Sequence, residues 1–321
     1  MELGTFLNLL SIIGLLFLLM VAGYICRRTG IISEEGSKHL SKLIISLGQP
    51  MMIVGALISK EFSVELFKEG LFYLVLGLIL HPVMALVAFL ASPLFPGGTR
   101  KNLSIFATIF NNCGFIGFPI LAAIFPGKGV FYGAFFVIGF HLYLWTIGIW
   151  ILSRGEEHIR LTPKKALLNY GTIPCAIGFL LYLLKGVLPF PSFVIDFTNQ
   201  LGNLCLPVSV LVTGALLASQ NMRALLTDLK LYLFNLVKLI GVPIVICLLA
   251  KLVTLGMQDS YSVVLFCTVI SALPSAATVT MLAELYDLDA PYAARVVGST
   301  SILSLATLPL LYFIGDLIAR L

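Results

Sequence analysis

The chain is a succession of long apolar stretches separated by short polar ones. A membrane-spanning helix needs roughly 20 consecutive apolar residues, and ten stretches approach or exceed that length. We predict one spanning helix in each, at residues 5–26, 40–58, 71–90, 103–124, 130–152, 166–188, 193–218, 229–253, 263–285 and 292–318. The first stretch lacks a preceding basic region, so it is predicted to be a membrane helix and not a cleaved signal peptide.

The composition strengthens this interpretation. Of the 321 residues, 59% are hydrophobic and 11% are charged, whereas a soluble domain carries about 25% charged residues. These proportions exclude a soluble domain, a disordered chain and a secreted disulfide scaffold. The apolar residues are continuous and do not alternate, which argues against a transmembrane β-barrel. We therefore predict an all-α polytopic membrane protein.

The basic residues predict the orientation, because loops on the cytoplasmic side are enriched in Lys and Arg. With the N-terminus and the C-terminus outside, the cytoplasmic loops carry most of the basic residues of the chain: Arg27, Arg28, Lys38, Lys42, Arg100, Lys101, Arg154, Arg160, Lys164, Lys165, Arg223 and Lys230. The outer side carries fewer: Lys60, Lys68, Lys128, Lys185 and Arg320. The net charge of +5 is explained by this bias, and no nucleic-acid partner is expected.

The polar loop 153–165 divides the ten segments into two sets of five. An odd number of helices per half means that the halves face opposite sides of the membrane, so any repeat between them is inverted. We predict a first five-helix repeat at 1–152, a cytoplasmic linker at 153–165 and a second, inverted repeat at 166–321. Both second helices carry a proline followed by Gly-Ala-Leu, at Pro50 and Gly55 in one and at Pro207 and Gly214 in the other.

The fourth helix of each half is interrupted. The first reads Asn-Asn-Cys-Gly-Phe-Ile-Gly-Phe-Pro, and its candidate site residues are Asn111, Asn112, Gly114, Gly117 and Pro119. The second contains Ser271, Pro274, Ser275 and Thr278. Unpaired backbone groups are costly in hydrocarbon, so such breaks must be buried in protein or line a water-filled cavity. Paired breaks at matching positions point to a binding site, and half-helix N-termini there favour an anion.

Three ionisable residues lie inside the predicted helices. Lys238 could snorkel to the inner interface or act as a counter-ion, and His81 and His141 could relay protons or be core histidines bonded to the backbone. The six cysteines include no C-x-x-C pair, and the histidines form no H-E-x-x-H pattern. No metal, no cofactor and no enzymatic activity are therefore expected.

At these residues the chain resembles the auxin efflux carrier family, as a bacterial-type relative of the plant carriers. The resemblance covers essentially the whole length. It rests on the opening run from Gly23 to Ile32 with Leu40 to Pro50, on Asn111 to Pro119, and on Leu273-Pro274 followed by Ser299-Thr300 and Thr307-Leu308-Pro309.

The resemblance implies ten helices in two inverted five-helix repeats, with broken helices 4 and 9 crossing at Pro119 and Pro274. It implies a scaffold of helices 1, 2, 6 and 7, with a homodimer through that scaffold as one option, and a crossover bundle that moves like an elevator. The matching binding positions are Asn112 and Pro274. This chain departs from the plant carriers in having Ser271, Ser275 and Thr278 where their second broken helix has an asparagine, and in lacking their long cytosolic loop.

The function that follows is a secondary transporter, a permease or efflux carrier, that moves a small organic anion or carboxylate across the cytoplasmic membrane. Auxin, malate and malonate are substrates that the resemblance suggests. The alternatives are a sodium- or proton-coupled symporter of another amphipathic solute, and a channel or sensor of the same fold.

Overall fold

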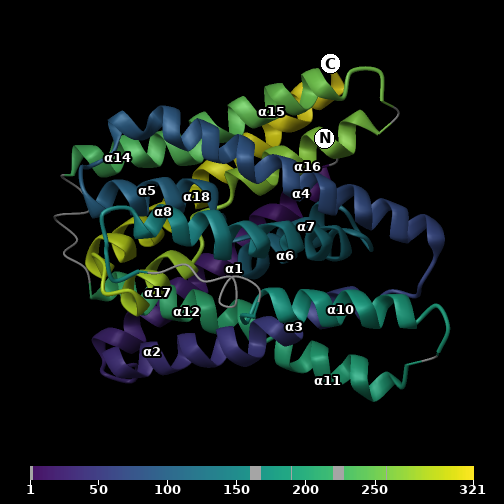
Figure 1. The fold of residues 1–321 in the computed structure, drawn as a ribbon, viewed down its shortest axis with the longest axis horizontal. Helices are drawn as coiled ribbons and strands as arrows, with labels where there is room; N and C mark the ends of the chain where they lie inside the picture. The colour runs from purple at the N-terminus through teal and green to yellow at the C-terminus, as the bar shows by residue number, and fades with distance from the viewer. Residues whose placement is uncertain (1–2, 160–167, 189, 220–227, 258) are drawn as a thin grey trace.

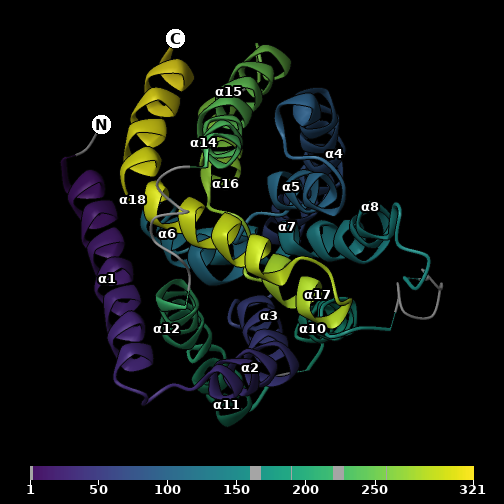
Figure 2. The same ribbon diagram turned by 90° about the vertical axis from the view of Figure 1, so that its left-hand side faces the viewer.

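The structure is a computed structural model that describes residues 3–159, 168–188, 190–219, 228–257 and 259–321. Every regular element in this part of the chain is a helix. Both ribbon views place α2, α3, α10, α11 and α12 in a lower group and α4, α5, α14, α15 and α16 in an upper group (Figures 1 and 2).

The described helices of the first half are α1 (Leu3–Arg28), α2 (Glu34–Leu43), α3 (Gln49–Ile58), α4 (Val64–Ala91), α5 (Thr99–Ile109), α6 (Phe118–Ile124), α7 (Gly129–Tyr143) and α8 (Ile149–Ser153). Short helical turns connect several of them: η1 (Ile44–Gly48), η3 (Cys113–Gly117) and η4 (Leu144–Gly148) are π-helical, and η2 (Ser92–Leu94) is a 3-10 turn.

The described helices of the second half are α10 (Thr172–Leu184), α11 (Ser192–Gly202), α12 (Cys205–Ala218), α14 (Leu229–Leu236), the π-helical turn η5 (Val237–Gly241), α15 (Val242–Val253), α16 (Ser260–Ala272), α17 (Thr278–Leu285) and α18 (Ala290–Arg320).

Three of the π-helical turns share a sequence cause. Each ends at a glycine that is followed two residues later by a proline, as in Gly48–Pro50, Gly117–Pro119 and Gly241–Pro243. Proline has no backbone N–H and its ring crowds the preceding turn, so the helix accommodates it with one wider turn.

The structure corrects several of the predicted boundaries. The second helix begins at Glu34 and not at residue 40, because the Ser33 hydroxyl oxygen accepts a hydrogen bond from the Gly36 N–H (2.8 Å) and caps it. The third helix begins at Val64 and not at residue 71, because the Ser63 hydroxyl oxygen accepts a hydrogen bond from the Leu66 N–H (3.1 Å) and caps it. The sixth, α10, runs from Thr172 to Leu184 and not over 166–188. The segment 193–218 is divided into α11 and α12 at Asn203 and Leu204. Of the predicted linker 153–165, residues 160–165 lie outside the described part of the chain.

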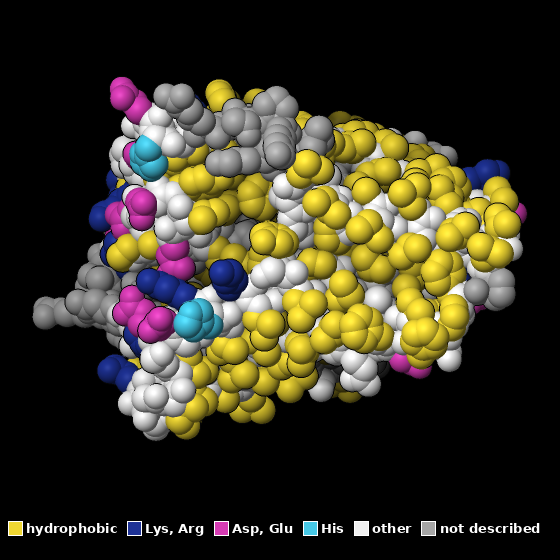
Figure 3. All heavy atoms as spheres, turned by 60° about the horizontal axis from the view of Figure 1, so that its bottom comes forward, with side chains coloured by type: hydrophobic (Ala, Val, Ile, Leu, Met, Phe, Trp, Pro, Cys, Tyr) yellow, Lys and Arg dark blue, Asp and Glu magenta, His cyan; other side chains and the backbone are white. Residues whose placement is uncertain are grey.

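The outer surface is suited to lipid. Six described stretches are long and apolar enough to cross a membrane: Glu34–Ile58, Val64–Leu94, Gly129–Ser153, Ser192–Ala218, Leu229–Val253 and Ala290–Arg320. Cys113–Ile124, Thr172–Leu184 and Ser260–Ala272 are shorter apolar helices. Hydrophobic side chains cover the middle and right of the face in Figure 3, and charged side chains gather mainly at its left-hand end.

Helices α1 and α12 come from opposite halves and pack at backbone distance. A methyl group at Gly23 would overlap the Leu211 carbonyl, and one at Gly214 would overlap the Met20 carbonyl. Small residues allow this close approach between membrane helices, where packing and not hydrophobicity drives association.

Gly214→Ala is therefore expected to lower the free energy of unfolding by about 1–3 kcal/mol, the usual cost of overpacking. Thermal unfolding of the purified protein in detergent measures the effect. Gly14→Ala is the matched control on α1, because among the described residues no atom from outside its own helix turns lies within 4 Å of the added methyl group and Ala favours the helix. Equal unfolding temperatures for the two variants would contradict the close packing.

Candidate functional site

The two interrupted helices meet at their breaks. After α5 the chain is extended through Phe110 and re-enters a helix at Cys113, and after α16 it is extended at Leu273 and re-enters a helix at Thr278. Asn111 and Ser275 pair as an antiparallel bridge. The Asn112 N–H donates to the Pro274 carbonyl (2.8 Å) and the Ala276 N–H donates to the Phe110 carbonyl (2.9 Å).

These bonds satisfy backbone groups that the breaks release, as burial in a membrane protein requires. The crossing lies at Asn111 and Asn112, so its expected position at Pro119 is wrong. Pro119 instead lies where η3 continues into α6, and the wider turn of η3 accommodates its ring and its missing N–H. Pro274 lies at the crossing, as predicted.

Asn111 is fully engaged in holding the crossing together. Its side-chain nitrogen donates to the Ile270 carbonyl (2.8 Å), and its side-chain oxygen accepts a hydrogen bond from the Lys238 ammonium. Lys238 also donates to the Ser271 carbonyl (3.3 Å). Lys238 is completely buried, so it does not snorkel to the interface. Its ammonium lies at the carboxyl end of α16, where the helix dipole favours a cation.

The serines of the second break also form hydrogen bonds within the protein. The Ser275 hydroxyl donates to the Ala107 carbonyl (2.9 Å), and the Ser275 N–H donates to the Thr300 hydroxyl oxygen (3.2 Å). The Ser271 hydroxyl donates to the Cys267 carbonyl (2.7 Å). Both hydroxyl groups therefore bind carbonyls of α5 and α16.

Asn112 and Thr278 are different because their side chains have no partner in the described structure. The Asn112 amide makes no side-chain hydrogen bond there, and the Thr278 hydroxyl is buried without one. Both line, with Gly114, a small and partly open cavity of about 30 Å³, which the structure places beside the crossing. Gly117 is not among its lining residues; it packs against Leu273, on which a methyl group at this position would press.

Asn111, Gln49 and His141 complete the polar lining of the small cavity. The Gln49 side-chain nitrogen lies 3.0 Å from Nε2 of His141, and the Gln49 side-chain oxygen is buried without a partner among the described residues. His81, by contrast, bonds the Gly77 carbonyl through Nδ1 (2.6 Å) and lies among aromatic rings away from the small cavity. It has the contacts of a core histidine.

Two larger cavities lie on either side of the crossing. The α2–α17 cavity, of about 500 Å³, is lined by the first half of the 34–58 helix, by α12 and by α17. The α3–α6 cavity, of about 370 Å³, is lined by the second half of that helix, by α11 and by α6. The two cavities therefore follow each other along the 34–58 helix.

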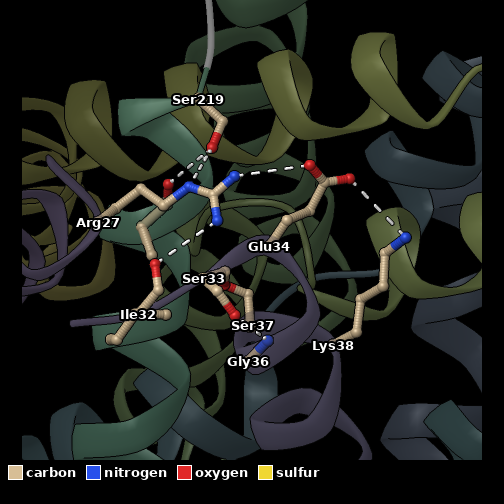
Figure 4. Close-up of polar contacts among 9 residues, drawn as sticks. Arg27, Ile32, Ser33, Glu34, Gly36, Ser37, Lys38 and Ser219 are labelled. Atoms are coloured by element: carbon tan, nitrogen blue, oxygen red, sulfur yellow. Dashed lines mark hydrogen bonds and ion pairs between the residues drawn. The ribbon is translucent and has the colours of Figure 1, made fainter. Parts of the chain in front are cut away.

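Charged residues form the rim of the α2–α17 cavity. The Arg27 guanidinium at the end of α1 donates to the Ser219 hydroxyl oxygen (3.0 Å) and lies 3.6 Å from Glu34, which in turn lies 3.8 Å from Lys38 (Figure 4). These contacts connect α1, α2 and α12. Glu284 and Asp287 line the opposite wall, so the rim carries both signs of charge.

Comparison with known proteins identifies the class. A sequence profile described as membrane transport protein matches residues 11–312. The chain is 24% identical over 298 residues to an uncharacterized transporter of Methanothermobacter thermautotrophicus, covering 91% of this chain and 93% of that protein. It is 23% identical over 314 residues to an uncharacterized transporter of Methanocaldococcus jannaschii, covering 94% and 97%.

The protein is thus a multi-pass membrane transporter and not an enzyme. It belongs to the membrane transport protein family, the auxin efflux carrier family that its motifs resemble.

Proposed function

We propose that the protein is a secondary transporter of a small organic anion, and that the carboxylate group of the anion binds at the small cavity beside the crossing, whose volume of about 30 Å³ is too small for the whole anion. The observation that carries this proposal is the Asn112 amide, which lies at the start of a helix and has no side-chain partner among the described residues. The helix formed by η3 and α6 begins at Cys113, directly after Asn112, and α17 begins at Thr278.

Two helix N-termini are therefore directed at one cavity. The partial positive charge of each N-terminus favours a carboxylate. The free Asn112 amide and Thr278 hydroxyl add hydrogen-bond donors without placing a fixed charge in the cavity, which would be expensive to bury. A carboxylate brings the missing negative charge and accepts from both groups.

The proposed topology is ten helices in two inverted repeats, with both termini outside the cytoplasmic membrane. The two breaks support it, because they occur at the fourth segment of each half and lead into α6 and α17. Those two half-helices line the larger cavities on opposite sides of the crossing. We propose that the bundle around the crossing moves past the lower group of helices like an elevator and exposes the site to each cavity in turn.

The test is uptake of radiolabelled malate, malonate and aromatic carboxylates by proteoliposomes that contain the purified protein. Saturable uptake of at least one carboxylate, above that of empty liposomes, is expected. Thermal shift against the same compounds, with and without sodium and at two pH values, reports binding and any coupling ion. Failure of every carboxylate in both assays would contradict the proposal, and unitary currents would indicate a channel.

A further inference from the structure

Phe115 lies at the point where the three cavities meet. Of the described residues, it alone lines the small cavity, the α2–α17 cavity and the α3–α6 cavity. Met52 and Gly114 line the small and the α3–α6 cavities, and Ala277 lines the small and the α2–α17 cavities. The Phe115 ring thus lies where the three spaces converge.

The ring is packed against helices other than its own. Phe115 belongs to η3, directly after the crossing, and only 6% of it is exposed. It forms a small cluster with Ile44 of η1 and Cys205 of α12, and Met52 of α3 packs against this cluster. The cluster is separate from the main hydrophobic core that holds Phe118. The Phe115 contacts therefore join the crossing to the lower group of helices.

We propose that the Phe115 ring is the barrier between the two larger cavities and, together with Met52, sets the largest solute that can be accepted. The claim that Phe115 separates the two larger cavities stands on the cavities alone. The claim that it limits the size of the solute rests on the proposed transport of carboxylates. An aromatic ring suits this position because it closes the space with apolar surface and leaves no polar group to hold the solute there.

Cys205 provides a readout of the barrier that needs no substrate. Its side chain is fully buried in the cluster with Phe115. In a variant whose other five cysteines are replaced by Ala, a membrane-impermeant maleimide is expected to label Cys205 slowly. Phe115→Ala should accelerate labelling by about tenfold or more, equivalent to lowering a local opening free energy by about 1.4 kcal/mol. Phe115→Trp should keep the slow rate.

Phe118→Ala is the matched control. Phe118 is equally buried and close in sequence, but it lines only the α3–α6 cavity of the three, so its removal should leave Cys205 labelling slow. A cooperative thermal unfolding transition establishes that each variant is folded. The proposed barrier would be contradicted if Cys205 were labelled at the wild-type rate in folded Phe115→Ala. It would also be contradicted if Phe118→Ala accelerated the labelling as much as Phe115→Ala does.

Uptake measurements test separately the claim that Phe115 limits the size of the solute. Phe115→Ala should raise uptake of an aromatic carboxylate relative to malonate by about tenfold or more, since one methylene of space changes selectivity by about 10- to 200-fold. An unchanged ratio would overturn this part. If wild-type protein takes up no carboxylate, the proposed function fails, while the labelling of Cys205 still decides the barrier.

Discussion

Asn112→Ala is expected to weaken carboxylate binding by about tenfold to hundredfold, because a hydrogen bond to a charged group contributes about 1.5–3 kcal/mol. The unfolding temperature should stay close to that of the wild type, since the Asn112 side chain makes no hydrogen bond to another described residue. Its structural bond to Pro274 comes from the backbone N–H, which Ala retains. Thermal shift titration with the best carboxylate measures both quantities.

Asn111→Ala, in contrast to Asn112→Ala, should mainly lower the stability of the protein. It removes partners of the Ile270 carbonyl and of the Lys238 ammonium, and leaving buried polar groups unsatisfied costs about 1–3 kcal/mol each, or more for a charge. We expect a clear loss of thermal stability. Asn111→Asp should recover part of it, because a carboxylate still accepts from Lys238. If Asn111→Ala and Asn112→Ala changed carboxylate affinity and unfolding temperature in the same way, the distinction between a ligand group at Asn112 and a structural group at Asn111 would be contradicted.

Lys238→Gln is expected to weaken anion binding by about tenfold or more while changing stability little. A unit charge near an anion contributes on the order of a few kcal/mol at the effective dielectric constant of a protein, and Gln removes that charge from the neighbourhood of the crossing. Gln can still donate to Asn111, and removing the charge also removes the cost of burying an ammonium.

Lys238→Met separates the hydrogen bond from the charge. Met supplies neither, so Asn111 and the Ser271 carbonyl both lose their donor, and the unfolding temperature should fall below that of the Gln variant. The measurements are isothermal binding of the carboxylate and thermal unfolding for each variant. Wild-type anion affinity in Lys238→Gln would show that the ammonium serves the fold alone.

The sequence predicts the broken helices well because proline, glycine and asparagine act locally. Apolar length locates the helical segments, and Pro274 is correctly expected at the crossing. The site is less predictable, since the roles of Asn111 and Asn112 differ only through partners from the other half of the chain. The hydroxyl groups of Ser271 and Ser275 bind carbonyls that the sequence does not place beside them.

Phe115 and Lys238 show two further limits. An apolar residue in an apolar segment gives no sign that three cavities converge on it, so Phe115 is not a candidate from the sequence. Lys238 lies eight residues into its predicted helix, a depth compatible with both snorkelling and burial. Only the packing of η5 against the crossing distinguishes them.

The bridge between Asn111 and Ser275 has a consequence for biosynthesis. While the ribosome is still making the second half, the extended residues after α5 have no partner for the N–H of Asn112 and the carbonyl of Phe110. Exposed to lipid, such groups cost several kcal/mol, so the nascent first half must keep this segment hydrated or coiled until α16 and the residues after it are inserted. Helix α1 likewise has no close-packed partner until α12 is inserted. Assembly is therefore completed late in translation, and truncated chains that end before Ser275 should be recognised as unfinished by membrane quality control.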